Sequence, residues 1–256
     1  MCQNSNKLHL LITKKMTPKI IHYCWFGKSP LPPLALKCID SWRKFLPDYE
    51  IREWTEANFD VNQTAYTAGA YKCKKFAFVS DYARFKIMYD YGGIYFDTDV
   101  EVIKPLDHIV TKGSFWGLEK SKEGLSCNPG LGFACPPGLD LCQEMIHHYE
   151  NDTFIYPNGK YNLTTVVDVF SKLLRSKGFS FSSFPEELDG VHIYPPEYFS
   201  PIDSNTGETV ITQHTHTIHH YAASWVNKYD NMSFFEIIWN ILHLPNTNIR
   251  GRLFRK

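Results

Sequence analysis

The sequence predicts an α/β fold, with a mixed and mainly parallel sheet flanked by helices. Three observations lead to this prediction. The first 54 residues read as strand, loop, helix and strand, an order typical of parallel sheets. A long apolar helix later ends at two glycines and leads directly into another strand. The length of 256 residues, with 43% hydrophobic and 21% charged residues, suits a globular chain with a large core.

The first two strands and the helix between them lie within residues 19–54. Residues 19–27 form an apolar, β-branched run that ends in glycine, so we expect a buried strand followed by a loop. Three prolines then precede an amphipathic pattern over residues 34–45, which predicts a helix. Residues 49–54 alternate between polar and apolar side chains and predict a short second strand.

The clearest helix covers residues 76–91. Ser80 or a residue near it is the expected N-cap, and apolar side chains follow on one face. Gly92 and Gly93 are expected to end this helix, as glycine does just past a helix terminus. An apolar strand over residues 94–96 follows directly.

The rest of the chain predicts further strands and helices on the same plan. We expect strands at 114–119, 191–194 and 210–216, helices at 139–149 and 164–175, and a glycine- and proline-rich loop at 128–132. This organisation predicts one domain over residues 17–228, preceded by a flexible N-terminal arm over residues 1–16. Residues 229–256 are expected to form a C-terminal helix and a basic tail.

Composition argues against several classes of function. The 27 basic and 27 acidic residues give a formal net charge of zero, which argues against a general nucleic-acid-binding protein. The seven cysteines are odd in number and contain no C-x-x-C pair, so we expect reduced thiols in a cytoplasmic protein. The sequence shows no signal-peptide pattern and no run of about 18 apolar residues, so we expect no membrane span.

Two carboxylates, Asp97 and Asp99, follow the apolar strand 94–96. On a regular strand their side chains would share one face of the sheet. Unpaired charge is costly to bury, and a divalent cation such as Mn²⁺ or Mg²⁺ is a suitable partner for carboxylate oxygens. A solvated loop is the alternative reading of an isolated D-x-D pattern.

Asp81 and Arg84 lie three residues apart on the predicted helix 76–91. The simplest interpretation is a surface ion pair, worth at most ~1 kcal/mol. The glycine turn that follows the helix can instead fold it back beside the strand that leads to Asp97. Two acids, an arginine and a carboxylate pair would then face one cleft.

At this point the sequence resembles a known family. Residues 80–84 read Ser-Asp-Tyr-Ala-Arg and residues 91–99 read Tyr-Gly-Gly-Ile-Tyr-Phe-Asp-Thr-Asp. Together they resemble the signature of glycosyltransferase family 32, which includes bacterial capsule and lipopolysaccharide enzymes, the yeast initiating mannosyltransferase and the clostridial glucosylating toxins. Residues 19–27 are similar to the first strand of that family, and residues 219–225 are similar to its closing H-x-x-x-S-W element. The resemblance covers residues 17–226.

The resemblance implies a GT-A type nucleotide-sugar-binding fold and a role for each matching residue. Asp97 and Asp99 would hold the metal and the nucleotide-sugar, with Asp99 the more direct metal ligand. Asp81 and Arg84 would hydrogen-bond hydroxyls of the donor sugar, which completes the expected catalytic set. Tyr95 would line the nucleotide pocket, Trp25 would stack on the base, and Asn128 would contact the sugar. Ser224 and Trp225 would close over the phosphates. His220, with His219 as the alternate, would approach the metal.

The implied activity is a metal-dependent transfer of a hexose, with retention of configuration, from a nucleotide-sugar to a glycan acceptor. A UDP-sugar is the favoured donor, and the acceptor is expected to be an oligosaccharide or a lipid-linked glycan. The resemblance favours a bacterial enzyme of capsular or lipopolysaccharide biosynthesis. We expect it in the cytoplasm, peripherally at the inner face of the cell membrane.

Other readings of the same residues remain open. His214, His216, His219 and His220 are spaced so that two of them would share a strand face, which offers an independent zinc site. A non-catalytic nucleotide- or carbohydrate-binding protein would explain the aromatic residues, and a metal-dependent phosphoesterase would also use the acids. The apolar residues 234–242 and the basic residues 250–256 are compatible with docking on an anionic membrane or with a helix packed on the domain.

Overall fold

The computed structural model describes residues 16–121, 124–182, 184–203 and 207–222. Its strands in chain order are β1 (Ile20–Cys24), β2 (Glu50–Trp54), β3 (Gly93–Tyr95), β4 (Val100–Val102), β5 (Ser114–Ser121), β6 (Gly124–Cys127), β7 (Phe133–Cys135), β8 (Glu186–Leu188), β9 (Val191–Tyr194) and β10 (Thr217–His219). Its helices are α1 (Pro33–Phe45), α2 (Ala65–Lys72), α3 (Phe76–Tyr91), α4 (Asp107–Val110), α5 (Asp140–Glu150), α6 (Val166–Ser176) and α7 (Pro196–Phe199), and Pro129–Leu131 form one 3-10 turn.

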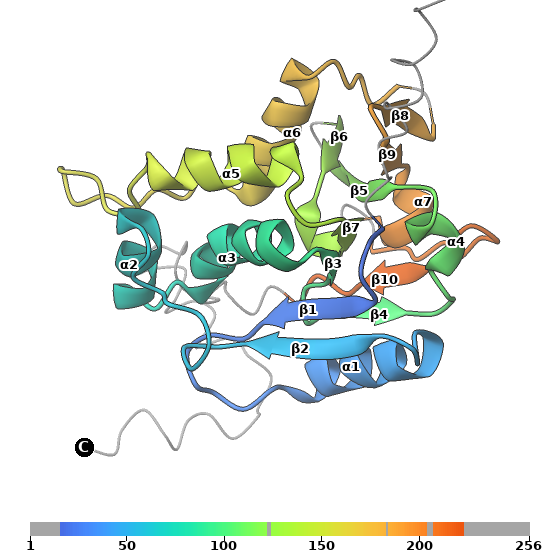
Figure 1. Cartoon of the computed structure of the whole chain (residues 1–256), viewed down its shortest axis with the longest axis horizontal. Helices are drawn as coiled ribbons and strands as arrows, with labels where there is room; N and C mark the ends of the chain where they lie inside the picture. The colour runs from blue at the N-terminus through green and yellow to red at the C-terminus, as the bar shows by residue number, and fades with distance from the viewer. Residues whose placement is uncertain (1–15, 122–123, 183, 204–206, 223–256) are drawn as a thin grey trace, which may run out of the picture. The chain divides into compact units, whose positions relative to one another are not determined.

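The central element is an eight-stranded sheet with the order β2-β1-β3-β7-β5-β9-β8, in which β6 pairs with β5 (Figure 1). Within the described residues, β1, β2, β3, β5 and β9 run in one direction, whereas β6, β7 and β8 run in the other. This arrangement confirms the predicted mixed, mainly parallel sheet. A separate antiparallel ladder joins β4 to β10 and brings the end of the described chain back to the middle of the sequence.

Two apolar clusters hold the helices against the sheet. One cluster includes the buried side chains of α3, α5 and α6, and the other includes those of α1 together with residues that flank β3 and β4. Trp42 of α1 is fully buried and donates its indole N–H to the carbonyl of Val100 at 2.7 Å. As a result, α1 fixes β4 directly after the carboxylate pair.

The glycine pair after α3 sets the path into β3. Gly92 has a φ of +63°, and a Cβ there would lie 2.6 Å from the backbone nitrogen of Pro137. A Cβ on Gly93 would lie 2.5 Å from the carbonyl oxygen of Ile20 on the neighbouring strand. The nearby His22 side chain also bonds the carbonyl of Gly92 at 2.9 Å. Because any larger residue would push the strands apart, both glycines are needed for this turn.

Most predicted elements are confirmed, and several local predictions are wrong. Helix α3 begins after Lys75 without a side-chain cap, and Ser80 lies inside it, where its hydroxyl donates to the carbonyl of Phe76. Helix α2 was not predicted, because its alanine- and glycine-rich sequence lacks a clear apolar period; it begins with a capping box at Thr64. The predicted boundaries at residues 16 and 228 lie at or outside the edges of the described residues.

The predicted strand over residues 210–216 is also wrong, because this segment is a loop and the strand is β10. Threonine side chains bond the loop backbone: the Thr212 amide donates to the Thr215 hydroxyl at 2.9 Å, and the His214 amide donates to the Thr212 hydroxyl at 3.1 Å. Such local bonds compete with a strand ladder. Among the described residues, no helix has the length and apolar character needed to span a membrane.

Candidate functional site

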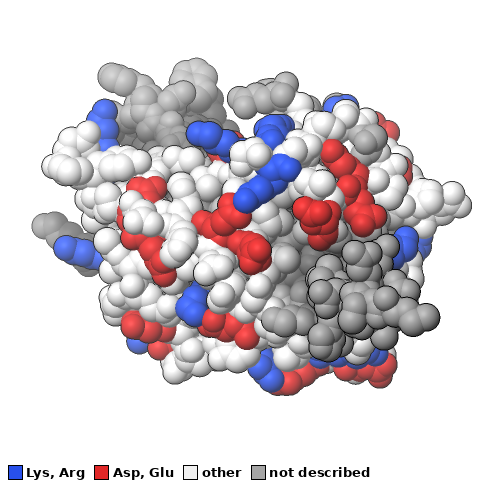
Figure 2. Space-filling view, turned by 45° about the horizontal axis from the view of Figure 1, so that its top comes forward, with Lys and Arg blue, Asp and Glu red and all other residues white. Residues whose placement is uncertain are grey.

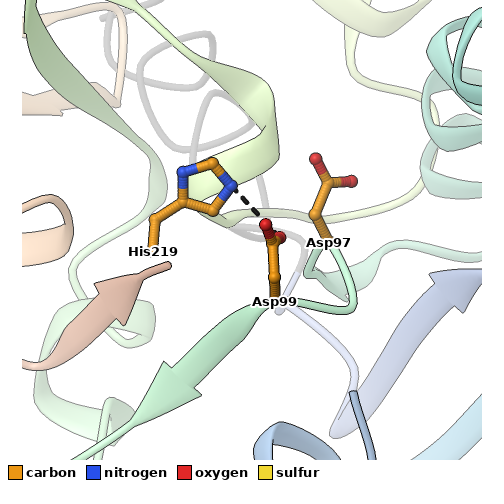
Figure 3. Close-up of side chains that lie close together, drawn as sticks. All are labelled: Asp97, Asp99 and His219. Carbon is orange, nitrogen blue, oxygen red and sulfur yellow. Dashed lines mark ion pairs between the residues drawn. The ribbon is translucent and has the colours of Figure 1, made fainter. Parts of the chain in front are cut away.

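The two carboxylates lie in the turn between β3 and β4 rather than on a strand, so the predicted shared strand face is wrong. The Val100 amide donates to the carbonyl of Asp97 at 3.1 Å, which closes this turn. The turn still directs both carboxylates to one place, where the side chain of His219 meets them from β10 (Figure 3). One potential ligand atom from each of the three residues lies within 4.8 Å of the other two.

The pairing of β10 with β4 brings His219 to the carboxylates. His219 lies opposite Val100 in this ladder, and its Nε2 is 3.2 Å from Oδ1 of Asp99. Its other ring nitrogen, Nδ1, is buried and has no hydrogen-bond partner among the described residues. Burial alone would lower the pKa of His219, but Asp99, with smaller effects from Asp97 and Glu119, raises it above its ordinary value.

A buried arginine neutralises part of the acidic charge. Arg84 on α3 donates to Asp81 at 2.9 Å, approaches Asp97 at 3.4 Å and lies 5.0 Å above the ring of Tyr95. Only 4% of the Arg84 side chain and 9% of the Asp81 side chain are exposed. Burial lowers the pKa of Arg84, but the neighbouring Asp97, Tyr95 and Asp81 outweigh it, and the net shift is upward. The arginine is therefore a fixed cation beside the carboxylate pair.

Asp81 has an unusual proton affinity for a carboxyl group. Burial raises its pKa to about 7, with Arg84 opposing this rise and Asp97 adding to it. Near neutral pH the site can therefore hold or release a proton at this carboxyl. Perturbed groups of this kind gather at functional sites, although buried ion pairs in other places can show them as well.

The glycine- and proline-rich loop supports Asp97 from the other side. The Gly130 carbonyl accepts from the Asp97 amide at 3.3 Å, and a Cβ on Gly130 would collide with Oδ2 of the same aspartate. Asn128 caps this turn, because its Oδ1 accepts from the Gly130 amide at 2.7 Å. Only a glycine at position 130 allows the backbone to approach the carboxylate so closely.

The structure places the remaining predicted residues in different surroundings. Tyr95 is 1% exposed and lies beneath Arg84, so it supports the arginine rather than facing an open pocket. Trp25 is half-buried and lines a hollow of about 370 Å³ together with Lys28, Ser29, Glu53 and residues 55–57. The predicted residues Ser224 and Trp225 lie outside the described residues.

The structure brings His219, named above as the alternate, to the carboxylates in place of His220. The ring of His220 bonds Glu101 at 2.8 Å, and the same carboxylate accepts from Lys37 at 2.8 Å. The backbone amide of His220 donates to the carbonyl of Asp99 at 3.0 Å. Because side chains alternate along a strand, only one of the two adjacent histidines can face the acidic turn.

The alternative zinc reading of the histidine cluster is not supported by the geometry. His214 stacks on Tyr198, and His216 bonds the carbonyl of Pro105 at 3.0 Å and packs on His108. Across the described part of the chain, the candidate metal-binding group is Asp97, Asp99 and His219.

Sequence reasoning missed two residues of the site, Glu119 and Tyr221. Oε2 of Glu119 accepts from the Asn128 amide at 2.7 Å and from the Tyr221 hydroxyl at 3.0 Å. The ring of Tyr221 lies edge-on to the ring of His219, with 4.3 Å between centroids. Glu119 stands in no recognisable motif, and Tyr221 occupies an unspecified position of the H-x-x-x-S-W element at residues 219–225, so only the fold shows that they belong together.

The donor set of the acidic turn fits a divalent cation. Two carboxylates and an imidazole meet at one point, where Nε2 of His219 faces Asp99. The inclusion of a nitrogen ligand favours Mn²⁺ over Mg²⁺, because Mg²⁺ is bound by oxygen ligands.

On the face drawn in Figure 2, acidic and basic side chains of the described residues are interspersed.

The fold and the site define an α/β protein with a candidate divalent-cation site beside a buried aspartate–arginine pair. Residues 32–116 match the family model "Glycosyltransferase sugar-binding region containing DXD motif". This stretch contains Asp81, Arg84, Asp97 and Asp99. Over this stretch the chain is similar to the DXD-containing glycosyltransferases, in agreement with the resemblance described above.

Two curated relatives come from Schizosaccharomyces pombe. The chain is 28% identical over 142 residues to inositol phosphoceramide mannosyltransferase 1, which is 51% of this chain and 42% of the relative. It is 28% identical over 171 residues to inositol phosphoceramide mannosyltransferase 3, or 61% of this chain and 46% of that relative. The matches thus span less than half of the length of either relative.

A solved structure titled "PaToxG Glycosyltransferase" is also similar. It is 19% identical, with a TM-score of 0.47, over 63% of this chain and 70% of that chain.

Proposed function

We propose that this chain is a metal-dependent, retaining glycosyltransferase that moves a hexose from a nucleotide-sugar to a glycan acceptor. The convergence of Asp97, Asp99 and His219 beside the buried Asp81–Arg84 pair is the observation that carries the proposal. Four of these five residues lie within the stretch that matches the glycosyltransferase family model.

The acidic turn and His219 would hold the cation. When bound, Mn²⁺ would act as a Lewis acid and offset the negative charge of the diphosphate leaving group. Asp99 faces His219 directly, whereas Asp97 also contacts Arg84, which supports Asp99 as the residue that would ligate the cation more directly. The 3.4 Å contact with Arg84 holds the Asp97 carboxylate in the site.

The buried pair on α3 would position the sugar. Arg84 keeps its charge in a site that excludes water, and Asp81 offers oxygens that accept from sugar hydroxyls. As positive charge develops at the anomeric carbon, the carboxylate of Asp97, together with Asp81 when it is deprotonated, would stabilise it electrostatically. The site is preorganised, because these groups are already held by hydrogen bonds and burial.

The hollow beside Trp25 is the proposed site for the base of the nucleotide. Of the residues that line it, Trp25 follows β1, Glu53 lies near the end of β2 and residues 55–57 follow β2, and both strands run parallel to β3. The hollow therefore opens at the same edge of the sheet as the acidic turn, which is where open α/β sheets bind ligands. We favour a UDP-sugar as donor, and we place GDP-mannose beside it because both curated relatives are named mannosyltransferases.

The proposed acceptor is either an oligosaccharide or a glycan that is linked to a lipid. The names of the two yeast relatives include a lipid, inositol phosphoceramide, which favours the lipid-linked class. A role in capsular or lipopolysaccharide biosynthesis by a bacterial enzyme remains the expectation that the sequence resemblance implies. We further propose a cytoplasmic protein that binds the membrane surface through the basic residues 250–256. Loss of vesicle co-sedimentation on deletion of residues 245–256 would support this contact, and unchanged sedimentation would contradict it.

A thermal-shift panel tests the proposed function. UDP-glucose, UDP-galactose, UDP-N-acetylglucosamine and GDP-mannose are each added with and without Mn²⁺, since a ligand that binds the native state raises the melting temperature. We expect a shift for one donor only in the presence of Mn²⁺, and its loss in Asp99→Ala. The control is Asp40→Asn on α1, whose side chain is 72% exposed. The donor that shifts is then followed for Mn²⁺-dependent release of its sugar.

Other outcomes of the panel would point to other functions. A shift with free glycans alone, without a shift for any donor, would favour a carbohydrate-binding protein. Cleavage of simple phosphate esters without sugar transfer would favour a metal-dependent phosphoesterase. Either result would overturn the proposed function.

A further inference from the structure

Glu119 connects the two sides of the candidate metal site. This half-buried residue lies on β5 and receives two hydrogen bonds at a single oxygen, Oε2. One comes from Nδ2 of Asn128 at 2.7 Å and the other from the hydroxyl of Tyr221 at 3.0 Å. Asn128 follows Glu119 by only nine residues, after the β5–β6 hairpin, whereas Tyr221 lies 102 residues beyond Glu119, so the meeting of all three is a property of the fold.

The bond to Asn128 leads to Asp97. Oδ1 of Asn128 accepts from the Gly130 amide, and the Gly130 backbone lies directly against the Asp97 carboxylate. The amide group of Asn128 is thus committed on both sides, to Glu119 and to Gly130. A change in the position of Glu119 would move the turn that limits where Asp97 can lie.

The bond to Tyr221 leads to His219. The ring of Tyr221 contacts that of His219, and its hydroxyl also lies 2.6 Å from that of Ser200. Tyr221 has a φ of +47°, a conformation that L-residues rarely adopt and that surrounding contacts must maintain. The bonds to Glu119 and Ser200 are contacts of this kind.

We propose that Glu119 is a positioning residue that sets the separation between Asp97 and His219 and thereby the affinity of the site for Mn²⁺. The inference rests on the proposed function, because it assigns a task within the same site. Glu119 acts through the hydrogen bonds at Oε2, which orient the groups behind the ligands. Such outer partners of metal ligands typically change affinity by about 10- to 100-fold when they are removed.

The choice of variants separates hydrogen bonding from charge. Glu119→Gln keeps a carbonyl oxygen that can accept both bonds at the position of Oε2, but it removes the negative charge. Glu119→Ala removes the bonds and the charge together. Glu187→Ala on β8, whose side chain is 60% exposed, is the matched control.

Mn²⁺ affinity is measured for each protein by electron paramagnetic resonance of the free ion, without substrate. We expect Glu119→Ala to weaken the affinity by about tenfold or more, whereas Glu119→Gln and Glu187→Ala stay within about threefold of wild type. Hydrogen exchange of the Gly130 amide is the second readout, because its partner Asn128 is released only in the alanine variant. We expect faster exchange in Glu119→Ala alone.

The outcomes distinguish the two proposals. If Glu119→Ala keeps both the wild-type affinity and the wild-type exchange, the inference is overturned while the proposed function stands. If Glu119→Gln is as defective as Glu119→Ala, the charge acts instead of the bonds, and the inference is also overturned. If the wild-type protein binds no Mn²⁺, the proposed function fails, and the exchange at Gly130 still shows whether Glu119 holds the turn.

Discussion

Two aspartate–arginine pairs with the same spacing have opposite surroundings in this molecule. On α1, Asp40 and Arg43 form an ion pair of 2.6 Å with side chains that are 72% and 63% exposed. On α3, Asp81 and Arg84 form a pair of 2.9 Å with side chains that are 9% and 4% exposed. Both pairs join positions i and i+3 of a helix, so the sequence pattern does not distinguish them.

The difference between the pairs shows that burial and a third partner decide the role of such a motif. The pair on α1 faces solvent, where an ion pair contributes about 0–1 kcal/mol. The pair on α3 is enclosed beside Asp97 and above Tyr95, where removal of one partner leaves a buried charge uncompensated. Buried polar arrangements of this kind are retained at sites where charge must be held in place for function.

The largest expected effect separates the two arginines. Arg84→Ala should lower the free energy of unfolding by about 3–5 kcal/mol, because it leaves two carboxylates without their cation. It should also reduce sugar transfer by at least about 100-fold, since a fixed charge at the reacting centre is lost. Arg43→Ala should change the free energy of unfolding by less than about 1 kcal/mol. Urea unfolding and turnover measurements check both statements.

Arg84→Lys keeps the experiment informative if the alanine variant does not fold. Lysine keeps the charge but lacks the planar fork that reaches Asp81 and Asp97 together, so stability should recover more than activity. Equal effects of Arg84→Ala and Arg43→Ala would contradict the contrast between the pairs.

A smaller effect should separate the two aspartates. Asp81→Asn preserves the shape of the side chain but removes a charge next to Arg84, and we expect a loss of activity of about 10- to 100-fold. Because the neutral and charged forms of this carboxyl are about equally favourable near pH 7, the free energy of unfolding should change by less than about 1 kcal/mol. Asp40→Asn serves as the exposed counterpart and should match wild type in both measurements. Full activity of Asp81→Asn would exclude a role for this carboxylate in the reaction.

Two histidines extend the comparison to pH dependence. His22 is fully buried, accepts from the Trp54 indole at 3.0 Å and bonds the Gly92 carbonyl, and burial lowers its pKa from 6.5 to about 4. The unfolded chain therefore binds a proton at this residue below pH 6.5, whereas the folded chain does so only near pH 4. Stability from neutral His22 is fully present above that range and decreases as the pH falls through it, by up to about 3 kcal/mol.

Urea unfolding between pH 4 and 7 measures this contribution. His22→Gln should flatten the profile relative to wild type, whereas His147→Gln, at a side chain that is 68% exposed, should leave its slope unchanged. An unchanged slope in His22→Gln would show that the buried histidine does not contribute.

The smallest effects compare two hydroxyl residues near helix starts. The Thr64 side chain accepts from the Thr67 amide at 3.0 Å and caps α2, so Thr64→Ala should cost about 1 kcal/mol. Ser80 lies inside α3, where its hydroxyl donates to the Phe76 carbonyl, so Ser80→Ala should change stability by less than about 0.5 kcal/mol. Thermal unfolding resolves this difference, and a larger cost for Ser80→Ala would restore Ser80 as the cap.

The helices and strands that the sequence predicted correctly are those whose signal lies in residues adjacent along the chain. The apolar run of β1, the alternating pattern of β2, the amphipathic pattern of α1 and the glycines after α3 each carry a local signal. The acidic turn and the Asp81–Arg84 pair could be placed together because one glycine turn joins their elements. These local signals wrongly predicted a strand over residues 210–216, because they do not show that threonine side chains bond the backbone of this loop.

The parts of the site that were not predicted depend on long-range pairing. His219 and His220 are adjacent, and the register of β10 against β4 decides which of them faces Asp99. A slip of one residue would exchange the two side chains, and the sequence contains no feature that sets this register. Glu119 lies on an alternating strand without a motif, so its contacts with Asn128 and Tyr221 emerge only from the fold.

The most direct test of the account is the detection of nitrogen on bound Mn²⁺ by electron spin-echo envelope modulation. The account predicts a ¹⁴N coupling from a histidine ligand in the wild-type protein and in His220→Gln, and its loss in His219→Gln. In a titration with Mn²⁺ followed by electron paramagnetic resonance of the free ion, Asp99→Asn should weaken binding, whereas Asp40→Asn should not. Loss of the nitrogen signal in His220→Gln, or its absence in the wild-type protein with Mn²⁺ bound, would contradict the proposed Asp97–Asp99–His219 site.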